Sequence, residues 1–105
     1  MILLTYGTRP EYIKIKPLIK EFKNSNLPFK ILFTGQHKDI ANGEYDFKLE
    51  MTDLSNNRLD SVIANLMTLS DDIFDEVTHV LVQGDTTSVV GLSLAALHRK
   101  IKLIH

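Results

Sequence analysis

Short apolar runs alternate with helix-like segments along almost the whole chain, and this alternation restricts the fold more than any other feature. The apolar runs have the length of buried strands and cover residues 2–6, 29–34, 77–83 and 101–104. Between them, apolar residues recur every three or four positions, as on one face of a helix, in segments 10–23 and 59–69, whereas the helical segment 86–98 is apolar on nearly every side. Such alternation predicts an α/β fold: a Rossmann-like, mostly parallel sheet with right-handed crossovers and helices on both faces.

The secondary structure of the polar stretch 35–57 is less clearly indicated by its sequence. Residues 45–51 alternate between polar and apolar, which favours a short strand at the edge of the sheet. The acidic segment 71–76, DDIFDE, is typical of a solvated turn, and its spacing matches no metal-binding loop. At 105 residues the chain is long enough for one compact domain and too short for two.

Composition excludes several classes of protein. A net charge of −1 provides no basic field for nucleic acid or an acidic membrane surface. The absence of cysteine excludes disulfides and thiolate metal sites, and it suits a cytoplasmic protein. The sequence has no signal-peptide start, no apolar run long enough to span a bilayer, no G-x-G-x-x-G and no Walker loop. We therefore expect no nucleic acid, membrane, metal, nicotinamide cofactor or P-loop chemistry.

The first strand-to-helix junction, GTRPE, contains one residue that a helix start does not explain. Thr8 and Glu11 fit a capping box, Pro10 suits the first turn, and Gly7 allows a sharp turn. Arg9 is different, because a cation beside a helix N-terminus opposes the helix dipole. An anion bound there by free backbone N–H groups and by the guanidinium would account for it.

The second junction, QGDTTS, places Asp85 after a strand and a glycine and before the apolar helix. As a helix N-cap, Asp85 would be unremarkable. At the same sheet edge as Arg9, it becomes a candidate for acid/base chemistry or for orienting a substrate hydroxyl. The sequence leaves an alternative open, in which Arg9 simply pairs with Glu11 or with Asp85.

Three further polar residues fall near the same edge of the predicted sheet. Lys14 lies one helical turn beyond Pro10, and Gln36 and His37 follow the second strand. A single histidine in such a position is more often an ordinary loop residue than a catalyst.

Three segments, YGTRPEYIKIKPLI, FTGQHKD and VLVQGDTTSVVGLSLAALHRKIKLIH, together resemble the bacterial non-hydrolysing UDP-N-acetylglucosamine 2-epimerase family. The likeness spans nearly the whole chain. Hydrolysing relatives typically have Gly-Ser-Arg-Ala-Glu where this chain has Gly-Thr-Arg-Pro-Glu, so the first motif resembles the non-hydrolysing branch. The resemblance implies a cytoplasmic, homodimeric enzyme of the glycosyltransferase-B type, with two Rossmann-like domains and the substrate between them. Residues 1–105 would then be part of the N-terminal domain, with the second domain absent.

The resemblance also implies a reaction and roles for the motif residues. The family interconverts UDP-N-acetylglucosamine and UDP-N-acetylmannosamine for surface polysaccharide synthesis, by elimination and re-addition of UDP, without a cofactor. Arg9 would stabilise the UDP leaving group, Lys14 would lie near the phosphates or sugar, and Asp85 would be a catalytic carboxylate. The remaining motif residues would contact the substrate: Gly7, Thr8, Pro10 and Gly84. A possible second, regulatory UDP-N-acetylglucosamine site would involve Gln36, His37 and Arg58.

The sequence departs from the family pattern at three places. Gln83 stands where many members have histidine, and Asp39 stands where a longer amide or acid is common. The chain ends at His105, so the glutamate of the next family motif is missing, and we expect the fragment alone to be inactive. Two alternatives stay open: a C2 epimerase of another UDP-2-acetamido sugar, and a noncatalytic domain that binds a nucleotide sugar or a partner chain.

Overall fold

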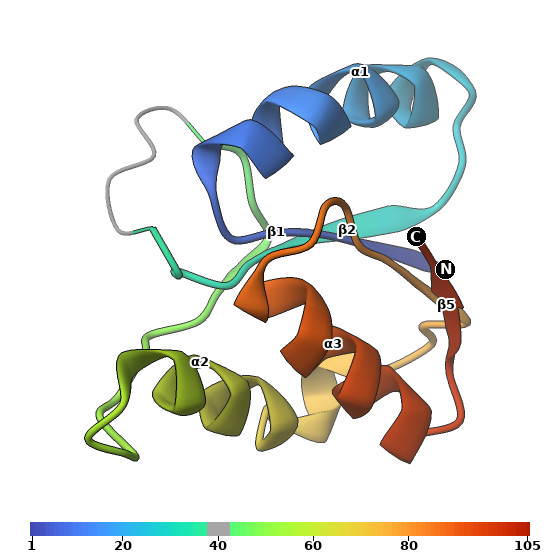
Figure 1. The fold of residues 1–105 in the computed structure, drawn as a ribbon. Helices are drawn as coiled ribbons and strands as arrows, with labels where there is room; N and C mark the ends of the chain where they lie inside the picture. Colours follow the sequence, from blue (N-terminus) through green and yellow to red (C-terminus); the bar gives the residue numbers. More distant parts are fainter. Residues whose placement is uncertain (38–42) are drawn as a thin grey trace.

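Five parallel strands form one sheet in the order β3-β2-β1-β4-β5 (Figure 1), which confirms the predicted α/β architecture. The structure is a computed structural model that describes residues 1–37 and 43–105. Every neighbouring pair of strands is parallel, as βαβ crossovers require. The strands are β1 (Ile2–Tyr6), β2 (Phe29–Phe33), β3 (Phe47–Lys48), β4 (His79–Leu81) and β5 (Lys102–Ile104).

The helices cover both faces of the sheet, as expected. In Figure 1, α1 lies on one face, and α2 and α3 lie together on the other. Successive residues of a strand point to opposite faces. Leu4 therefore joins the apolar cluster under α1, whereas Leu3 joins the cluster packed against α2 and α3. The helices are α1 (Arg9–Asn24), α2 (Arg58–Met67) and α3 (Thr87–His98). Within the described ranges, no helix combines the length and the hydropathy needed to cross a membrane.

Several elements differ in extent from the sequence prediction. The strand expected over 77–83 is regular only over His79–Leu81, although Val82 N–H still donates to Ile104 O at 2.8 Å. The acidic segment forms a short 3₁₀ helix at Asp71–Phe74 rather than a plain turn. The predicted edge strand over 45–51 is reduced to Phe47–Lys48.

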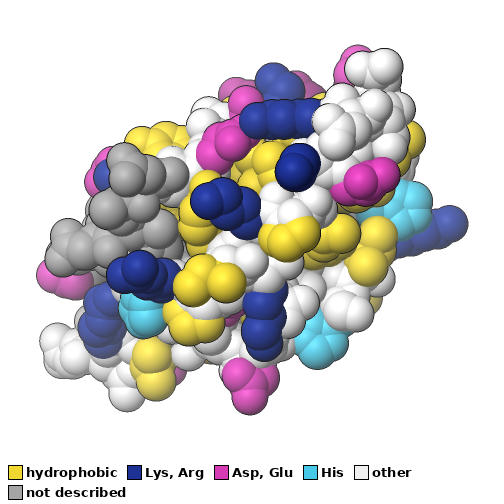
Figure 2. Space-filling model, turned by 90° about the horizontal axis from the view of Figure 1, so that it is seen from above, with side chains coloured by type: hydrophobic (Ala, Val, Ile, Leu, Met, Phe, Trp, Pro, Cys, Tyr) yellow, Lys and Arg dark blue, Asp and Glu magenta, His cyan; other side chains and the backbone are white. Residues whose placement is uncertain are grey.

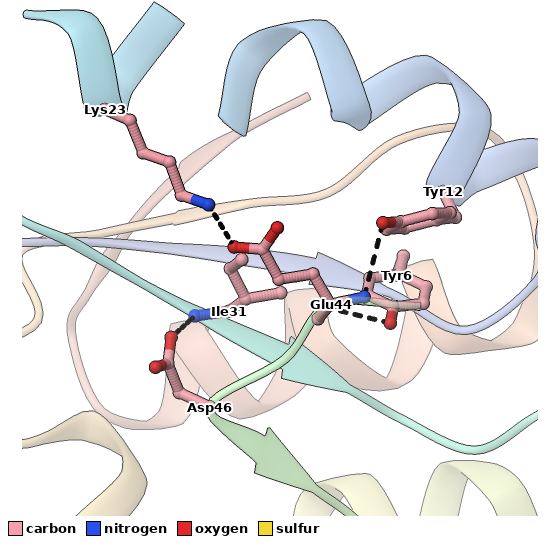
Figure 3. Close-up of polar contacts among 6 residues, drawn as sticks. All are labelled: Tyr6, Tyr12, Lys23, Ile31, Glu44 and Asp46. Carbon is pink, nitrogen blue, oxygen red and sulfur yellow. Dashed lines mark hydrogen bonds and ion pairs between the residues drawn. The ribbon is translucent and has the colours of Figure 1, made fainter. Parts of the chain in front are cut away.

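A side chain replaces part of this edge strand. The Asp46 carboxylate accepts the Ile31 N–H at 2.8 Å (Figure 3). The Asp46 N–H also donates to Ile31 O at 2.9 Å, so both backbone groups of Ile31 are satisfied without a longer β3. Just before it, the Tyr6 hydroxyl donates to Glu44 O at 3.0 Å, and Lys23 pairs with the Glu44 carboxylate at 2.6 Å. Burial, helped by the neighbouring Tyr12, Tyr45 and Glu44, raises the pKa of Tyr6 well above its ordinary value, so the phenol stays a donor.

Candidate functional site

The two motif junctions lie side by side at the carboxyl edge of the sheet. The first follows β1 and the second follows β4, and these strands are hydrogen-bonded neighbours. Ligands of open parallel sheets bind at this edge, where strands end and helices begin. The topology thus brings together the two segments that the sequence singled out.

The first junction forms the predicted helix start with one difference. Thr8 is the N-cap, and its hydroxyl oxygen accepts the Glu11 N–H at 3.4 Å. In a capping box the glutamate returns to the N–H of the N-cap residue. Here one Glu11 carboxylate oxygen accepts the Gly7 N–H at 2.8 Å, and the other accepts the hydroxyl of Thr86 in the second junction.

Glu11 is a functional candidate that the sequence reasoning missed, because it treated this residue only as part of a cap or as an ion-pair partner of Arg9. Its side chain is buried, with 4% of the residue exposed. Thr86 lies 75 positions away in the sequence. No local pattern could have indicated that partner.

Crowding, rather than a special backbone angle, explains the glycine at position 7. Positive φ angles among the described glycines occur at Gly35 and Gly84, and Gly7 is not one of them. A Cβ at Gly7 would lie 2.2 Å from the Thr34 hydroxyl oxygen and 2.4 Å from that of Ser88. The chain does bend at Gly7, as expected, but the bend needs no positive φ, and crowding is what excludes a side chain there. Gly84, at φ +90°, does have the conformation that favours glycine.

The loop after β2 is hydrogen-bonded to the first junction, to the start of α3 and to the start of α2. The Gln36 side-chain oxygen accepts the Ser88 N–H at 3.0 Å, and the Gln36 backbone carbonyl accepts the Arg58 guanidinium at 2.5 Å. The His37 N–H donates to Gly7 O at 2.8 Å, and the His37 ring is exposed. The three residues predicted for a regulatory site therefore lie together, next to the first junction. Asp39, which the sequence marked as a departure, lies outside the described residues.

The residues predicted to carry the chemistry are exposed. Arg9, Lys14 and Asp85 all have exposed side chains. The structure describes all of the residues concerned, and no ion pair joins Arg9 to Glu11 or to Asp85. The alternative explanation of Arg9 as a simple ion-pair partner of these carboxylates is therefore wrong. On the face covered by α1, Lys and Arg side chains are spread over the surface (Figure 2).

An open hollow of about 480 Å³ lies where the second junction faces α1, lined by Lys14, Gln83, Gly84, Asp85 and His105. The His105 ring lies 2.6 Å from the Gly84 carbonyl oxygen. Since a carbonyl only accepts, His105 Nε2 carries the hydrogen and donates, which restrains the loop before Asp85. A larger hollow, of about 530 Å³, lies beside Met1 and Glu76 at the opposite edge of the sheet, away from both junctions.

The arrangement suits an anionic ligand whose other end undergoes proton transfer. Arg9 and Lys14 supply positive charge at the start of α1, and Asp85 supplies a carboxylate at the neighbouring strand end. Within residues 1–37 and 43–105, no group of three or more His, Asp or Glu side chains is placed to hold a metal ion. Two cations beside a carboxylate can supply charge stabilisation and acid/base transfer.

Comparison with known proteins gives one consistent result. The protein-family model described as UDP-N-acetylglucosamine 2-epimerase matches residues 20–105. A UDP-N-acetylglucosamine 2-epimerase from Salmonella borreze is 36% identical over 113 residues, covering 99% of this chain and 30% of the relative. One from Campylobacter jejuni is 34% identical over 116 residues, with the same coverage of 99% and 30%. The chain thus spans about 30% of the length of the curated relatives it matches.

Solved structures agree with the sequence relatives. The crystal structure of the Neisseria meningitidis UDP-GlcNAc 2-epimerase bound to UDP-GlcNAc superposes with a TM-score of 0.84 at 30% identity, over 97% of this chain and 30% of that one. The Staphylococcus aureus MnaA–UDP structure gives a TM-score of 0.83 at 23% identity, over 97% of this chain and 29% of that one, a likeness of fold alone.

Proposed function

The chain belongs to the UDP-N-acetylglucosamine 2-epimerase family, and we propose that it forms part of the N-terminal, sugar-facing side of such an enzyme's active site. The reaction is the interconversion of UDP-N-acetylglucosamine and UDP-N-acetylmannosamine by the non-hydrolysing route. The product serves surface polysaccharide synthesis, and the whole enzyme acts as a homodimer in the cytoplasm. Residues 1–105 alone are inactive, because the chain provides only one wall of a site that lies between two domains.

One observation carries this proposal. Arg9 and Asp85 lie on adjacent strand-to-helix junctions, both exposed, while the groups between them are buried and hydrogen-bonded. A purely structural arginine or aspartate would be expected to find a partner in the fold, and these two form no ion pair with each other. Such a pair, a cation beside a carboxylate, suits a substrate with a diphosphate next to a reacting sugar carbon.

The proposed reaction proceeds through elimination and re-addition. A base removes the proton from C2 of the sugar, the C1–O bond breaks with its electron pair going to UDP, and a C1=C2 double bond forms in a 2-acetamidoglucal. A proton is then delivered to the opposite face of C2 while a UDP oxygen bonds to C1. Asp85 is the candidate for one of the proton transfers at C2. Arg9 offsets the charge that develops on the departing diphosphate, and Lys14 adds to it.

The other motif residues shape the site mainly through their backbone. Gly7 and Gly84 permit the close approach and the turn described above, and Pro10 starts the helix without an N–H group. Among the described residues, no acceptor is bonded to the backbone N–H of Thr8 or Arg9, which leaves two donors that a phosphate could engage. A regulatory UDP-N-acetylglucosamine site at Gln36, His37 and Arg58 stays a prediction, in which the exposed His37 ring provides the contact.

A chimera tests the proposal directly. Residues 1–105 replace the matching segment of the Salmonella borreze epimerase, and the product is incubated with UDP-N-acetylglucosamine in D₂O. We expect UDP-N-acetylmannosamine with deuterium at C2, because the proton is removed and replaced. Arg9→Ala and Asp85→Asn in the same chimera are expected to lower kcat by at least about 100-fold. Preferential turnover of another UDP-2-acetamido sugar would instead favour the alternative epimerase.

A second experiment uses the isolated 105-residue chain. Titration with UDP, followed by ¹⁵N NMR, should shift the amides of residues 8, 9 and 11–14, with a Kd on the order of 1 mM because half the site is missing. The same titration with Arg9→Ala should show no saturable shift. Tight one-to-one binding of UDP-N-acetylglucosamine by the isolated chain, together with an inactive chimera, would contradict the enzyme proposal and support a noncatalytic binding domain.

A further inference from the structure

A buried carboxylate that the proposed chemistry does not use lies between the two junctions. Glu11 is 4% exposed, although the two residues before it are exposed. Glutamate is rarely buried to this degree, because removing its charge from water is costly unless hydrogen bonds compensate. The burial of Glu11 at this place therefore requires an explanation beyond the start of a helix.

Each carboxylate oxygen is bonded to a different junction. One accepts the Gly7 N–H at 2.8 Å, within the turn that leads into α1. The other accepts the hydroxyl of Thr86, the N-cap residue of α3. The Thr86 side chain makes no capping bond to its own helix, although threonine commonly does so. The Thr86 hydroxyl therefore bonds Glu11 instead of capping α3.

This link connects two elements that otherwise have little contact. Among the described residues, no other hydrogen bond joins α1 to the loop before α3. That loop carries Asp85, one position before Thr86, and the start of α1 carries Arg9, two positions before Glu11. The Cγ of Glu11 would lie 3.8 Å from a Cβ built at Gly84, so the side chain also packs against the loop.

We infer that Glu11 is a positioning residue, which holds the Asp85 loop at a set distance from Arg9 without touching the substrate. The inference rests on the proposed function for the roles of Arg9 and Asp85. The link itself is independent of that function. A carboxylate is suited to this task because it accepts two charge-assisted hydrogen bonds in fixed directions. Loss of the bond to Thr86 leaves the loop held by the His105 bond to the Gly84 carbonyl, while Gln36 holds only Ser88 in α3.

Thr86→Val is the sharpest test, since it removes the donor and keeps the shape of the side chain. Thr86→Ser keeps the hydroxyl, and Thr87→Val makes the same chemical change one position away, at a residue whose side chain makes no hydrogen bond within the described chain. In the isolated chain without ligand, ¹⁵N relaxation gives the order parameters of residues 84–86. We expect a fall from about 0.85 to below about 0.6 in Thr86→Val, and no change in the other two variants.

The chimera described above provides the functional readout. Thr86→Val should lower kcat about 100-fold, since a carboxylate displaced by about 1 Å loses its alignment with C2. The KM for UDP-N-acetylglucosamine should change less than about threefold, because Arg9 and its backbone donors are untouched. Thr86→Ser should restore kcat. A merely structural role would lower thermal stability and kcat together, without this separation from KM.

The outcomes separate the two proposals. Unchanged order parameters in Thr86→Val, or a kcat equal to that of Thr87→Val, would overturn the positioning role. An inactive unmodified chimera, together with no UDP binding by the isolated chain, would overturn the proposed function. In that case the relaxation data still decide whether Glu11 holds the loop, since they need neither ligand nor turnover.

Discussion

The two junctions use the same elements, a strand end, a glycine and a helix start, and yet they are held in different ways. The first is held largely by its own residues, with one added bond from the His37 N–H to the Gly7 carbonyl. Thr8 caps α1, Pro10 needs no acceptor, and Glu11 turns back to Gly7. The second is held by residues from elsewhere in the chain: Glu11 binds Thr86, Gln36 binds the start of α3, and His105 binds the Gly84 carbonyl.

From this difference we expect the first junction to be the more rigid part of the site and the second junction to be the more adjustable part. A junction stabilised by its neighbours in sequence is expected to form early and to stay in place. A junction that depends on three distant segments takes its final position only when the sheet and both helical layers are assembled. Arg9 lies on the first and Asp85 on the second, so the cation is expected to be held more firmly than the carboxylate.

The largest expected effect comes from crowding the first junction. Gly7→Ala places a Cβ at 2.2 Å and 2.4 Å from two buried hydroxyl oxygens, of Thr34 and Ser88, which are themselves hydrogen-bonded at 2.9 Å. One of these side chains must move, so we expect a loss of about 3 kcal/mol in the free energy of unfolding, measured by urea denaturation. A loss below about 1 kcal/mol would show that β1 and α3 are less closely packed than described.

The next effect comes from removing the shared carboxylate. Glu11→Ala leaves the buried Gly7 N–H and the Thr86 hydroxyl without their acceptor, and we expect a loss of about 2 kcal/mol in the free energy of unfolding. Glu11→Gln is the matched control, because its amide oxygen still accepts one hydrogen bond and its NH₂ can donate to the threonine oxygen. Equal losses in the two variants would mean that charge, rather than the two bonds, determines the stability.

The first junction was largely predictable from the sequence, and the second was not. Apolar runs of strand length and a Thr-x-x-Glu helix start are local signals, so the parallel sheet and the start of α1 follow from residues close together in the chain. The bonds from Glu11 to Thr86 and from Gln36 to Ser88 span 75 and 52 positions, and no residue pattern specifies such a pair. Likewise, the Asp46 side chain shortens β3 by occupying a backbone donor of β2, a competition that alternation of residues does not reveal.

Backbone strain introduced at the second junction is expected to lower the free energy of unfolding less than crowding introduced at the first. Gly84 has φ +90°, and a Cβ there would meet only ordinary contacts with Glu11 at 3.8 Å and 3.9 Å. Gly84→Ala is therefore expected to lose about 1 kcal/mol in the free energy of unfolding, all of it from the unfavourable backbone conformation. A loss as large as that of Gly7→Ala would remove the distinction between the two glycines.

The smallest effect on stability, and one of opposite sign, is expected at Arg9. The side chain is exposed, forms no ion pair with the described carboxylates Glu11 and Asp85, and places a positive charge at the positive end of the α1 dipole. Arg9→Ala should therefore raise the free energy of unfolding by about 0.3 kcal/mol at low salt, and the gain should shrink as salt screens the dipole.

Lys16→Ala is the matched control, since it removes an exposed cation from the same helix beyond its first turn. A destabilised Arg9→Ala variant would mean that the guanidinium supports the fold, and the case for an anion site at this junction would then lose its basis. A stabilised Arg9→Ala variant that no longer binds UDP would show that the Arg9 charge lowers the free energy of unfolding and yet is needed for the ligand. Such a cost is expected where a residue is retained for the ligand it binds.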